Sequence, residues 1–430
     1  MLTAIAGINW GDEGKGRMVD MLSDRFDIIC RYQGGNNAGH TVINDMGMFK
    51  LNLLPSGIFR KDVVNIMGCG MVVDIEHLCG EIEQVRAQGV DITPQNLKLS
   101  ESAFICMPYH KMHDILEEER LADKKYGSTR RGIAPAYGDK YMKKALRVGE
   151  LLELIEGNTS EFESKLGYIL EWKNLTLKGY PGYNKVELSE TLKWLRTYGA
   201  VIKPFIANTS KLLQTAVDDK QNILFEAQLG ALRDIDYGIY PYTTSSQTLA
   251  AYAPIGAGIP GTRLNRVIGV TKAYSSCVGE GPFAAEMFGD EARALRVAGG
   301  EFGAATGRPR RVGGFDMVAS RYGVSVQGAD ELALTKLDVI SNLDKIPVCV
   351  AYNIDGVIRE RFPIGGELAR ATPVIEYMEG WQTDITKCRT PGDLPRAALN
   401  YIKFIEKEVK CSIKYVSVGA GRDEYLIMEK

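Results

Sequence analysis

Two carboxylates lie inside a segment that otherwise resembles a phosphate-binding loop. The segment "GINWGDEGKGRMVD", residues 7 to 20, follows the apolar run "TAIAGI" and combines glycines with Lys15. Asp12 and Glu13 would repel a bound triphosphate unless a divalent cation lay between them. An aspartate at such a place can also take a proton from a bound substrate. The segment therefore predicts phosphate binding, with Asp12 as a Mg²⁺ ligand, a proton acceptor, or both.

This segment does not match the standard phosphate-binding pattern, G-x-x-x-x-G-K-[ST]. Gly7 and Gly14 are too far apart, and Lys15 is followed by Gly16 and Arg17 rather than by a hydroxyl. What remains is a strand, a glycine turn and a helix expected to begin near Gly16, whose free N–H groups can bind phosphate oxygens. A tight turn between strand and helix would explain the glycines alone.

A second candidate loop is "RYQGGNNAGHTV", residues 31 to 42. His40 lies there between Gly39 and Thr41, in a polar, glycine-rich stretch that can approach a ligand closely. A general acid is at least as good an interpretation of this histidine as a structural role.

Arginines and glycines alternate in "EFGAATGRPRRVGGFD", residues 301 to 316. The guanidinium groups of Arg308, Arg310 and Arg311 can bind carboxylates or phosphates through two parallel hydrogen bonds. In a chain with a net charge of −2 this cluster indicates an anionic ligand, although a solvated surface would also explain it.

The run "LTKLDV", residues 334 to 339, places Lys336 and Asp338 at the end of an apolar strand. Such an aspartate can accept hydrogen bonds from N1 and the 2-amino group of guanine, while the lysine stem covers the base. The pattern is weak by itself, because both residues are common.

The elements expected to position these residues are those of an α/β fold. Short apolar runs bounded by glycine alternate with amphipathic helical patterns, which predicts a large, mostly parallel central sheet flanked by helices. Residues about 108 to 215 form a mainly helical excursion. Because no repeat or linker marks a boundary, residues 1 to 430 are expected to form a single multilobed catalytic domain.

The bulk composition excludes several classes of protein. Apolar residues make up 45% and charged residues 25%, and the small net charge argues against nucleic acid or an anionic membrane as a partner. No apolar run reaches the length of a membrane span. The eight cysteines show no C-x-x-C pair, and the chain starts without a signal-like leader. These features predict a cytoplasmic protein with reduced thiols.

Together the segments resemble adenylosuccinate synthetase along essentially the whole chain. "WGDEGKG" followed at this distance by "NAGH" is highly specific, unlike either piece alone. The matching segments are "WGDEGKG" at 10 to 16, "GGNNAGHT" at 34 to 41, "RGIAPAYGDK" at 131 to 140, "DIDYGIYPYTTSS" at 234 to 246 and "KAYSSCVGEGPF" at 272 to 283, then "EFGAATGRPRR", "TKLDV" and "SVGAGRDE".

The resemblance implies a P-loop NTPase-like fold, usually a homodimer, that uses Mg²⁺, GTP, IMP and L-aspartate. It implies that Asp12 takes the N1 proton of the hypoxanthine ring and ligates Mg²⁺. His40 would donate a hydrogen bond or proton as O6 attacks the γ-phosphate of GTP. The amino group of aspartate would then displace phosphate from a 6-phosphoryl-IMP intermediate, giving adenylosuccinate, GDP and phosphate.

The resemblance also implies a set of site residues, by matching position. Besides the catalytic pair Asp12 and His40, those for GTP are Gly14, Lys15, Gly16, Thr41, Arg310, Lys336, Asp338, Ser417 and Gly419. Those for IMP are Asn37, Thr129, Lys143, Gln228, Thr244 and Arg308. Aspartate would be bound by Thr306, Arg308 and Arg310, and Mg²⁺ by Asp12 and the carbonyl of Gly39.

The chain departs from the family around the acceptor nucleotide. Arg130 and Ala134 replace glycines, and Lys143 replaces an arginine that normally reaches across the dimer. In "FEAQLGALRDID" the expected base-contacting glutamine becomes Leu229, with Gln228 one residue early. A bulge shifted by one residue would restore Gln228 to that role.

These departures leave the reaction type better supported than the acceptor. The leading hypothesis is a GTP-dependent ligase that makes adenylosuccinate from IMP. One alternative keeps the chemistry but uses GMP or dGMP as the acceptor, since a few pocket changes can redirect a site built on hydrogen bonds. Another is a non-catalytic guanine-nucleotide-binding protein, which would need neither the proton acceptor Asp12 nor His40.

Overall fold

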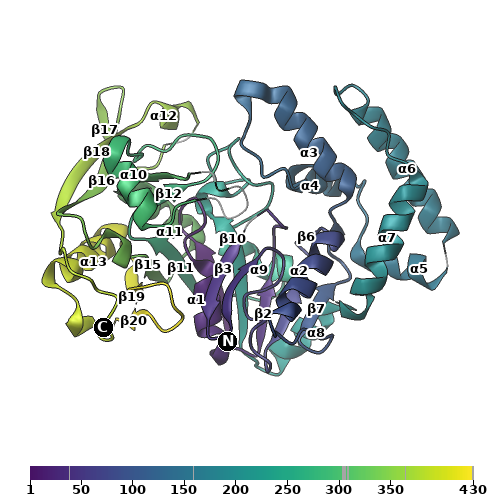
Figure 1. Cartoon of the computed structure of the whole chain (residues 1–430), viewed down its shortest axis with the longest axis horizontal. Helices are drawn as coiled ribbons and strands as arrows, with labels where there is room; N and C mark the ends of the chain where they lie inside the picture. Colours follow the sequence, from purple (N-terminus) through teal and green to yellow (C-terminus); the bar gives the residue numbers. More distant parts are fainter. Residues whose placement is uncertain (38, 158, 303–306, 308, 364, 429–430) are drawn as a thin grey trace.

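The structure is a computed structural model. It describes residues 1–37, 39–157, 159–302, 307, 309–363 and 365–428. The expected α/β class is confirmed, with a large, mostly parallel sheet at the centre and helices packed on both faces (Figure 1).

The central sheet has ten strands among the described residues, and its neighbouring pairs are parallel except for the last, β19 with β20. Most of its strands are buried on both sides, which explains their continuous apolar runs. In spatial order the strands are β20 (Tyr425–Ile427), β19 (Ser412–Ser417), β15 (Glu331–Thr335), β11 (Arg266–Lys272), β1 (Leu2–Gly7), β10 (Ile223–Gly230), β2 (Ile28–Arg31), β5 (Val64–Met67), β7 (Leu97–Ser100) and β9 (Ile206–Ala207).

Alternate residues of β1 pack on opposite faces of this sheet. Ile5 lies in a core with Met18 and Val19 of helix α1 (Lys15–Leu22), whereas Ala4 packs toward Leu213 of helix α8 (Thr209–Asp218). The remaining helices outside the helical excursion are α2 (Ile75–Ala87), α9 (Ala253–Ala257), α10 (Gly289–Ala298), α11 (Met317–Gln327), α12 (Gly366–Ala369) and α13 (Arg396–Val409).

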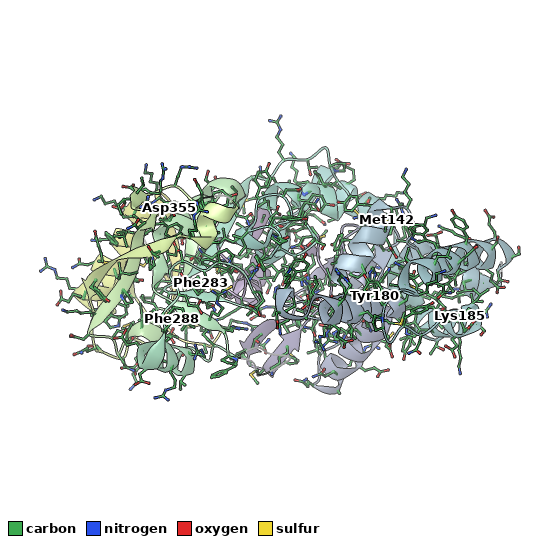
Figure 2. All side chains as sticks on the ribbon, turned by 90° about the horizontal axis from the view of Figure 1, so that it is seen from above. Met142, Tyr180, Lys185, Phe283, Phe288 and Asp355 are labelled. Atoms are coloured by element: carbon green, nitrogen blue, oxygen red, sulfur yellow. The ribbon has the colours of Figure 1, made fainter. Side chains whose placement is uncertain are left out.

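The helical excursion predicted near residues 108 to 215 is present. Between β8 and β10 the only described strand is the two-residue β9. Seen from above, this segment forms one end of the molecule, with Lys185 there and Asp355 at the opposite end (Figure 2). Its helices, besides α8, are α3 (Pro108–Leu121), α4 (Ile133–Tyr141), α5 (Leu151–Glu156), α6 (Ser160–Leu177) and α7 (Leu188–Ile202).

Smaller sheets complete the fold. In one of them the long strand β16 pairs with β14, β17 and β18, and the other strands form two-stranded ladders. Their bounds are β3 (His40–Asn44), β4 (Gly47–Leu51), β6 (Val72–Val73), β8 (Phe104–Ile105), β12 (Ser275–Cys277), β13 (Arg311–Gly313), β14 (Phe315–Asp316), β16 (Lys345–Ile354), β17 (Val357–Arg359) and β18 (Thr372–Glu379).

All eight cysteines, which lie within the described residues, are free thiols. Within the described residues, no helix combines the length and hydropathy that crossing a membrane would require.

Candidate active site

The candidate residues gather where parallel strands of the central sheet end. The loops after β1, β2, β10, β15 and β19 carry the predicted phosphate, acceptor and guanine residues. Carboxyl ends of parallel strands meet at one edge of a sheet, which is where α/β proteins bind ligands. Five segments that are far apart in sequence therefore build one site.

The loop after β1 is wound by glycines and by its own carboxylates. Gly11 and Gly14 have φ of 107° and 94°, and Asp12 has φ of 58°, a left-handed conformation that aspartate tolerates better than most residues. Gly14 is the N-cap of α1, so the first turn of this helix opens directly from the loop. Free backbone N–H groups there suit a phosphate, as the sequence predicted.

Glu13 has a structural task that the sequence did not reveal. Its Oε1 accepts hydrogen bonds from the backbone N–H of Asn9, at 3.1 Å, and of Gly11, at 2.8 Å. Its Oε2 lies 2.6 Å from Nζ of Lys15, and both side chains are almost completely buried. One of the two carboxylates therefore folds the loop and holds its lysine, while the other remains accessible.

The accessible carboxylate is Asp12, whose side chain is about one quarter exposed. Its Oδ2 lies 2.7 Å from Nη2 of Arg310, which belongs to the arginine-rich segment 301 to 316. The structure thus joins two residues, predicted from separate motifs, that are far apart in the chain. Asp12 is paired but still faces the open site.

His40 is held by a partner that the sequence analysis missed. Its Nδ1 lies 2.5 Å from Oε1 of Glu226, a fully buried residue of β10. The backbone N–H and the hydroxyl of Ser56 also donate to Glu226, at 2.8 and 2.6 Å. With Nδ1 occupied, Nε2 is the ring nitrogen of His40 that is available to a ligand.

Burial and charge act in opposite directions on this pair. Burial lowers the pKa of His40, although the hydrogen bond from His40 to Glu226 and the charge of Glu226 oppose the effect. Burial alone would raise the pKa of Glu226, but its hydrogen bond with His40 and the nearby charges of His40 and Arg31 bring that pKa below its usual value. Glu226 is therefore an anion that orients His40 and stabilises its protonated form.

The side chain of Gln228, predicted to bind IMP, is hydrogen-bonded within the protein. The residue is fully buried, and its Oε1 accepts from Nη2 of Arg31 and from the N–H of Gly35, each at 3.0 Å. Its Nε2 donates to the carbonyl of Gly35 and to Oδ1 of Asn37, at 3.0 and 2.8 Å. The amide is therefore held by the last residue of β2 and by the loop that follows it, next to the predicted IMP residue Asn37.

Leu229, the next residue of β10, lies beside the loop that follows β1. It has a φ of 61°, at an irregularity in the pairing of β1 with β10, and it is only partly buried. A Cβ built on Gly11, the neighbour of Asp12, would lie 3.3 Å from Cδ2 of Leu229. The wall next to Asp12 is therefore apolar at this position.

Asn37 contacts another residue of the predicted acceptor pocket. Its Nδ2 approaches the hydroxyl of Thr244 at 3.4 Å, so these two predicted IMP ligands lie together. The backbone N–H of Thr244 donates to the carbonyl of Arg233, whose guanidinium contacts the carbonyls of Tyr242, Val278 and Glu280. A buried arginine thus anchors this wall.

Thr129 and Arg130 lie in an exposed loop that Asp114 organises. Asp114 accepts hydrogen bonds from the hydroxyl of Ser128, at 2.6 Å, and from the N–H of Gly132, at 2.8 Å. Arg130 adopts a φ of 58°, so the loop keeps a left-handed residue although the glycine of the family is absent. Lys143, just beyond α4, is also exposed and has no ion-pair partner among the described residues.

In the predicted guanine pocket, one buried hydrogen-bond acceptor has no partner among the described residues. Oδ1 of Asp338 is buried without a hydrogen-bond partner in the described part of the chain, and burial raises the pKa of its carboxyl. An unpaired buried carboxylate oxygen is costly and rare, so it indicates a missing donor such as a guanine N–H. Lys336 lies close by and donates to the carbonyl of Gly299 at 2.6 Å.

Helix α1 is tied to the predicted guanine pocket through Arg17. Its Nη1 donates to the hydroxyl of Ser417 at 2.9 Å, and that hydroxyl donates to the carbonyl of Gly419 at 3.0 Å. The guanidinium also lies 4.4 Å from the ring centre of Tyr425. Ser417 and Gly419 therefore shape the pocket through internal bonds, whereas Thr41 is exposed at the start of β3.

The residues that could hold a metal ion are few. No group of three or more His, Cys, Asp or Glu that could hold an ion occurs in the described part of the chain. Mg²⁺ commonly binds through one or two carboxylates together with substrate phosphates, and an accessible Asp12 beside a helix N-terminus fits that mode. Two further predicted residues, Thr306 and Arg308, lie outside the described residues.

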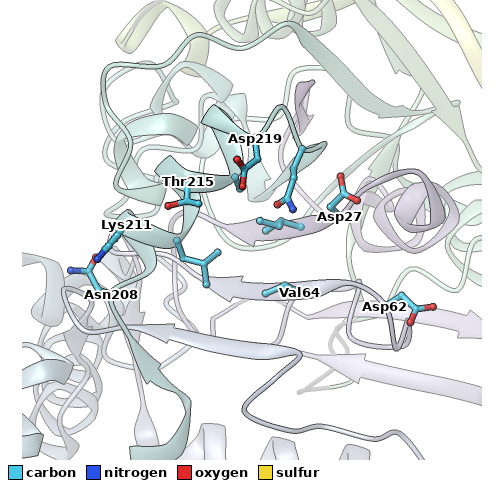
Figure 3. A pocket seen from close by; sticks show the side chains of 11 residues that line it. Asp27, Asp62, Val64, Asn208, Lys211, Thr215 and Asp219 are labelled. Atoms are coloured by element: carbon cyan, nitrogen blue, oxygen red, sulfur yellow. The ribbon is translucent and has the colours of Figure 1, made fainter.

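A separate hollow lies at the opposite edge of the sheet. It has a volume of about 590 Å³ and is lined by Asp27, Asp62, Lys211 and Asp219, among others (Figure 3). It opens where β2, β5 and β10 begin rather than where they end. Its lining includes none of the predicted site residues that the structure describes.

Comparison with known proteins agrees with this geometry. The adenylosuccinate synthetase family model matches residues 4–426. "Adenylosuccinate synthetase 2" of Pseudoalteromonas translucida is 45% identical over 98% of this chain and 99% of its own length. The enzyme of Carboxydothermus hydrogenoformans is 43% identical over 99% of this chain and 98% of its own.

Two solved structures extend the comparison. Fully ligated adenylosuccinate synthetase from Plasmodium falciparum superposes with a TM-score of 0.91, at 33% identity over the full length of both chains. Succinoaminodeoxyadenylate synthetase of cyanophage S-2L, at 17% identity and a TM-score of 0.61, shares the fold. This chain belongs to the adenylosuccinate synthetase family of GTP-dependent ligases.

Proposed function

We propose that this chain joins L-aspartate to IMP at the expense of GTP, forming adenylosuccinate, GDP and phosphate through a 6-phosphoryl-IMP intermediate. The observation that carries the proposal is the placing of accessible Asp12 and of His40, oriented by Glu226, beside the N-terminus of α1. Within the family this pairing of proton acceptor and proton donor serves synthesis rather than nucleotide binding alone. We propose that residues 1–430 act as one catalytic unit.

In the proposed first step, Asp12 accepts the proton from N1 of the hypoxanthine ring. Loss of that proton moves negative charge onto O6, which then attacks the γ-phosphorus of GTP. Because Glu226 occupies Nδ1, His40 would present Nε2 to the reacting oxygens. Negative charge that develops there favours the protonated imidazole, which can then donate from Nε2.

The GTP side is proposed to use the loop, its lysine and the orphaned carboxylate. The N–H groups of Gly14 and Gly16 and the ammonium of Lys15 would bind phosphate oxygens. Asp338 would accept from N1 and the 2-amino group of guanine, which satisfies its free Oδ1. Lys336 would cover the base with its aliphatic stem.

Members of this family use Mg²⁺ together with GTP. In this chain Asp12 and the carbonyl of Gly39 would hold the ion. When bound, Mg²⁺ neutralises phosphate charge and thereby removes the repulsion that Asp12 would otherwise exert.

The second step needs an anion receptor for aspartate. Arg310 is the candidate that the structure describes. Thr306 and Arg308 are proposed from their positions in the sequence alone. Because Arg310 contacts Asp12 in the ligand-free protein, binding of aspartate would compete for its guanidinium. The amino group of aspartate then attacks C6 of the purine, and phosphate leaves.

One observation favours a second candidate acceptor. Leu229 replaces a hydrogen-bonding side chain beside Asp12, so the wall here does not discriminate acceptors through an amide. The same chemistry on another 6-oxopurine monophosphate, GMP or dGMP, is therefore the alternative. The cyanophage structure named above contains dGMP, which is a property of that protein.

We further propose a homodimer in the cytoplasm, in which Lys143 binds the IMP phosphate of the partner subunit. The free cysteines suit a reducing compartment. Lys143 is exposed, and next to it Met142 is 51% exposed, which suits a surface that another subunit covers.

The acceptor is tested by incubating the protein with Mg²⁺, GTP and aspartate, with IMP, GMP or dGMP in separate reactions, and by measuring product masses. We expect the aspartate adduct of IMP. If the aspartate adduct formed only with GMP or dGMP, that nucleotide and not IMP would be the acceptor. Asp12→Asn should lower turnover at least about 100-fold, because the proton acceptor and the proposed carboxylate ligand of Mg²⁺ are both lost, while GTP binding measured without Mg²⁺ survives. Retained turnover would contradict the role of Asp12.

A further inference from the structure

A buried carboxylate, Glu301, lies between the proposed guanine and acceptor pockets. Its Oε1 is 2.9 Å from Nζ of Lys336, the residue placed over the guanine base. Its Oε2 is 2.9 Å from Nη1 of Arg310, whose other terminal nitrogen contacts Asp12 at 2.7 Å. A continuous chain of contacts therefore runs from Lys336 through Glu301 and Arg310 to Asp12.

Two further side chains fix the guanine-facing oxygen of Glu301. Nζ of Lys272, at the end of β11, lies 2.7 Å from Oε1, and the hydroxyl of Tyr274 donates to the same atom at 2.5 Å. Lys272 also donates to the hydroxyl of Ser276 at 2.6 Å. Glu301 has no exposed surface, so its rotamer is set by these partners.

Three cations surround Glu301 and its neighbours. Lys272, Arg310 and Lys336 contact the carboxylates of Glu301 or Asp12, and the carboxyl of Asp338 interacts electrostatically with Lys336. Burial lowers the pKa of Lys272 to about 8, and the nearby charges of Lys336 and Arg310 act in the same direction. Removing a carboxylate from such a buried cluster is costly, because it leaves cations without a partner.

We infer that Glu301 is a positioning residue that couples guanine-nucleotide binding to aspartate binding, by holding Lys336 on one carboxylate oxygen and Arg310 on the other. Guanine nucleotide bound under Lys336 restrains that lysine and, through it, the carboxylate. Arg310 then loses less conformational entropy when it binds the carboxylate of aspartate. The inference rests on the proposed function for the identity of the two ligands.

Such coupling is reciprocal, so it can be measured from either ligand. The dissociation constant of a non-hydrolysable GTP analogue with Mg²⁺ would be measured by calorimetry, with and without saturating L-aspartate. For the wild type we expect aspartate to tighten the analogue by about fivefold or more, within the usual range of such couplings. In Glu301→Gln, which keeps the shape but removes the charge, the ratio should fall below about twofold.

Glu286→Gln provides the matched control. Glu286 pairs with Arg311, the neighbour of Arg310. Among the contacts of the described residues, it has none with the side chain of Lys336 or of Arg310. Its variant should keep the wild-type ratio. Tyr274→Phe removes one donor from Oε1 without changing a charge and should lower the ratio at least about twofold. This milder variant decides the question if Glu301→Gln does not fold.

Three results would overturn the inference. They are a wild-type ratio near one, an unchanged ratio in Glu301→Gln or Tyr274→Phe, and an equal loss in Glu286→Gln. Because these titrations contain no acceptor nucleotide, they remain informative if IMP is not converted. Failure with IMP would overturn the proposed acceptor and leave the coupling ratio to be judged separately.

Discussion

At the scale of single residues, neighbouring positions in β10 have opposite tasks. Gln228 is turned inward and saturated by the loop after β2, whereas Leu229 is partly exposed beside Gly11. A side chain's direction at a strand irregularity depends on which residue takes the left-handed conformation, and here it is Leu229. Gln228 is therefore buried, and Leu229 is the more exposed of the two residues.

These opposite tasks can be distinguished by unfolding. Gln228→Leu should lower the free energy of unfolding by about 3–5 kcal/mol, because Arg31, Gly35 and Asn37 lose buried partners. Leu229→Gln should change it by less than about 1 kcal/mol, because the side chain is partly solvated. Urea denaturation of both variants measures the difference. Equal losses would contradict the assignment of Gln228 as structural and Leu229 as pocket-facing.

Glu226 sets the protonation of His40, so its removal should change the pH dependence of turnover. If protonated His40 donates to the substrate, kcat falls as the pH rises through the pKa of His40 in the complex. Loss of the Glu226 charge lowers that pKa, so in Glu226→Gln the alkaline limb should move to lower pH by roughly 1 unit or more.

Ser56→Ala serves as the comparison for this pH profile. It removes one hydrogen bond to Glu226 but keeps the carboxylate charge, so its alkaline limb should move less. An alkaline limb in Glu226→Gln that coincides with that of the wild type would show that His40 does not act as the donor.

At the scale of elements, the first turn of α1 must pass directly beneath His40. A Cβ built on Gly16 would lie 2.7 Å from Cβ of His40 and 2.9 Å from the hydroxyl of Ser56. Only glycine permits that approach. The glycine of the proposed phosphate-binding loop thus also sets the position of His40 on another element.

Gly16→Ala should therefore lower turnover at least about tenfold by displacing His40, since small misplacements of reacting groups are costly. Gly80 of α2 is the matched control, because a Cβ added there would meet no described atom within 4 Å. Gly80→Ala should leave kcat unchanged and stabilise the helix by about 0.5–1 kcal/mol. Steady-state kinetics and thermal unfolding of both variants provide the test, and unchanged turnover in Gly16→Ala would contradict the contact.

The helical excursion has its own buried anchor. Nε2 of His110 lies 2.9 Å from Asp139, and Nζ of Lys173 lies 2.7 Å from the same carboxylate, which joins α3, α4 and α6. Nδ1 of His110 accepts the N–H of Met107, so both ring nitrogens are occupied. His110 therefore serves packing.

At the scale of the whole molecule, the position of Lys143 makes a shared active site testable. Lys143→Ala and Asp12→Asn should each be nearly inactive, one for lack of a phosphate ligand and one for lack of a proton acceptor. After mixing and subunit exchange, half of the dimers are mixed, and one of their two sites contains both native residues. About a quarter of wild-type activity should return.

The control for this mixing experiment is each variant incubated alone through the same exchange. Analytical ultracentrifugation would establish that both remain dimeric. Lack of recovery from exchanged dimers would show that Lys143 serves the site of its own subunit.

Residues with chemistry that is local in sequence were predictable. The strand, glycine turn and helix around Lys15 are encoded within a few positions, so the phosphate loop and the accessible Asp12 could be inferred. Asp338 could similarly be proposed as a guanine ligand, since its carboxylate follows an apolar strand. Helix α1 begins at Lys15, within one residue of the expected position.

The partners of these residues could not be predicted, because each comes from a distant strand. Glu226 is 186 positions from His40, and nothing in "FEAQ" identifies it as the residue that orients a histidine. Glu301 is the first residue of a motif that was recognised, but its contact with Lys336 spans 35 positions.

By itself, the sequence determined the class of fold and the family, because strand patterns and loop motifs are short-range properties of the chain. The tertiary structure alone decided which carboxylates are buried and which remain accessible, and that Gln228 is buried while Leu229 is partly exposed. Burial, charge and hydrogen-bond saturation depend on segments that meet only when parallel strands bring their carboxyl ends to one edge of the sheet.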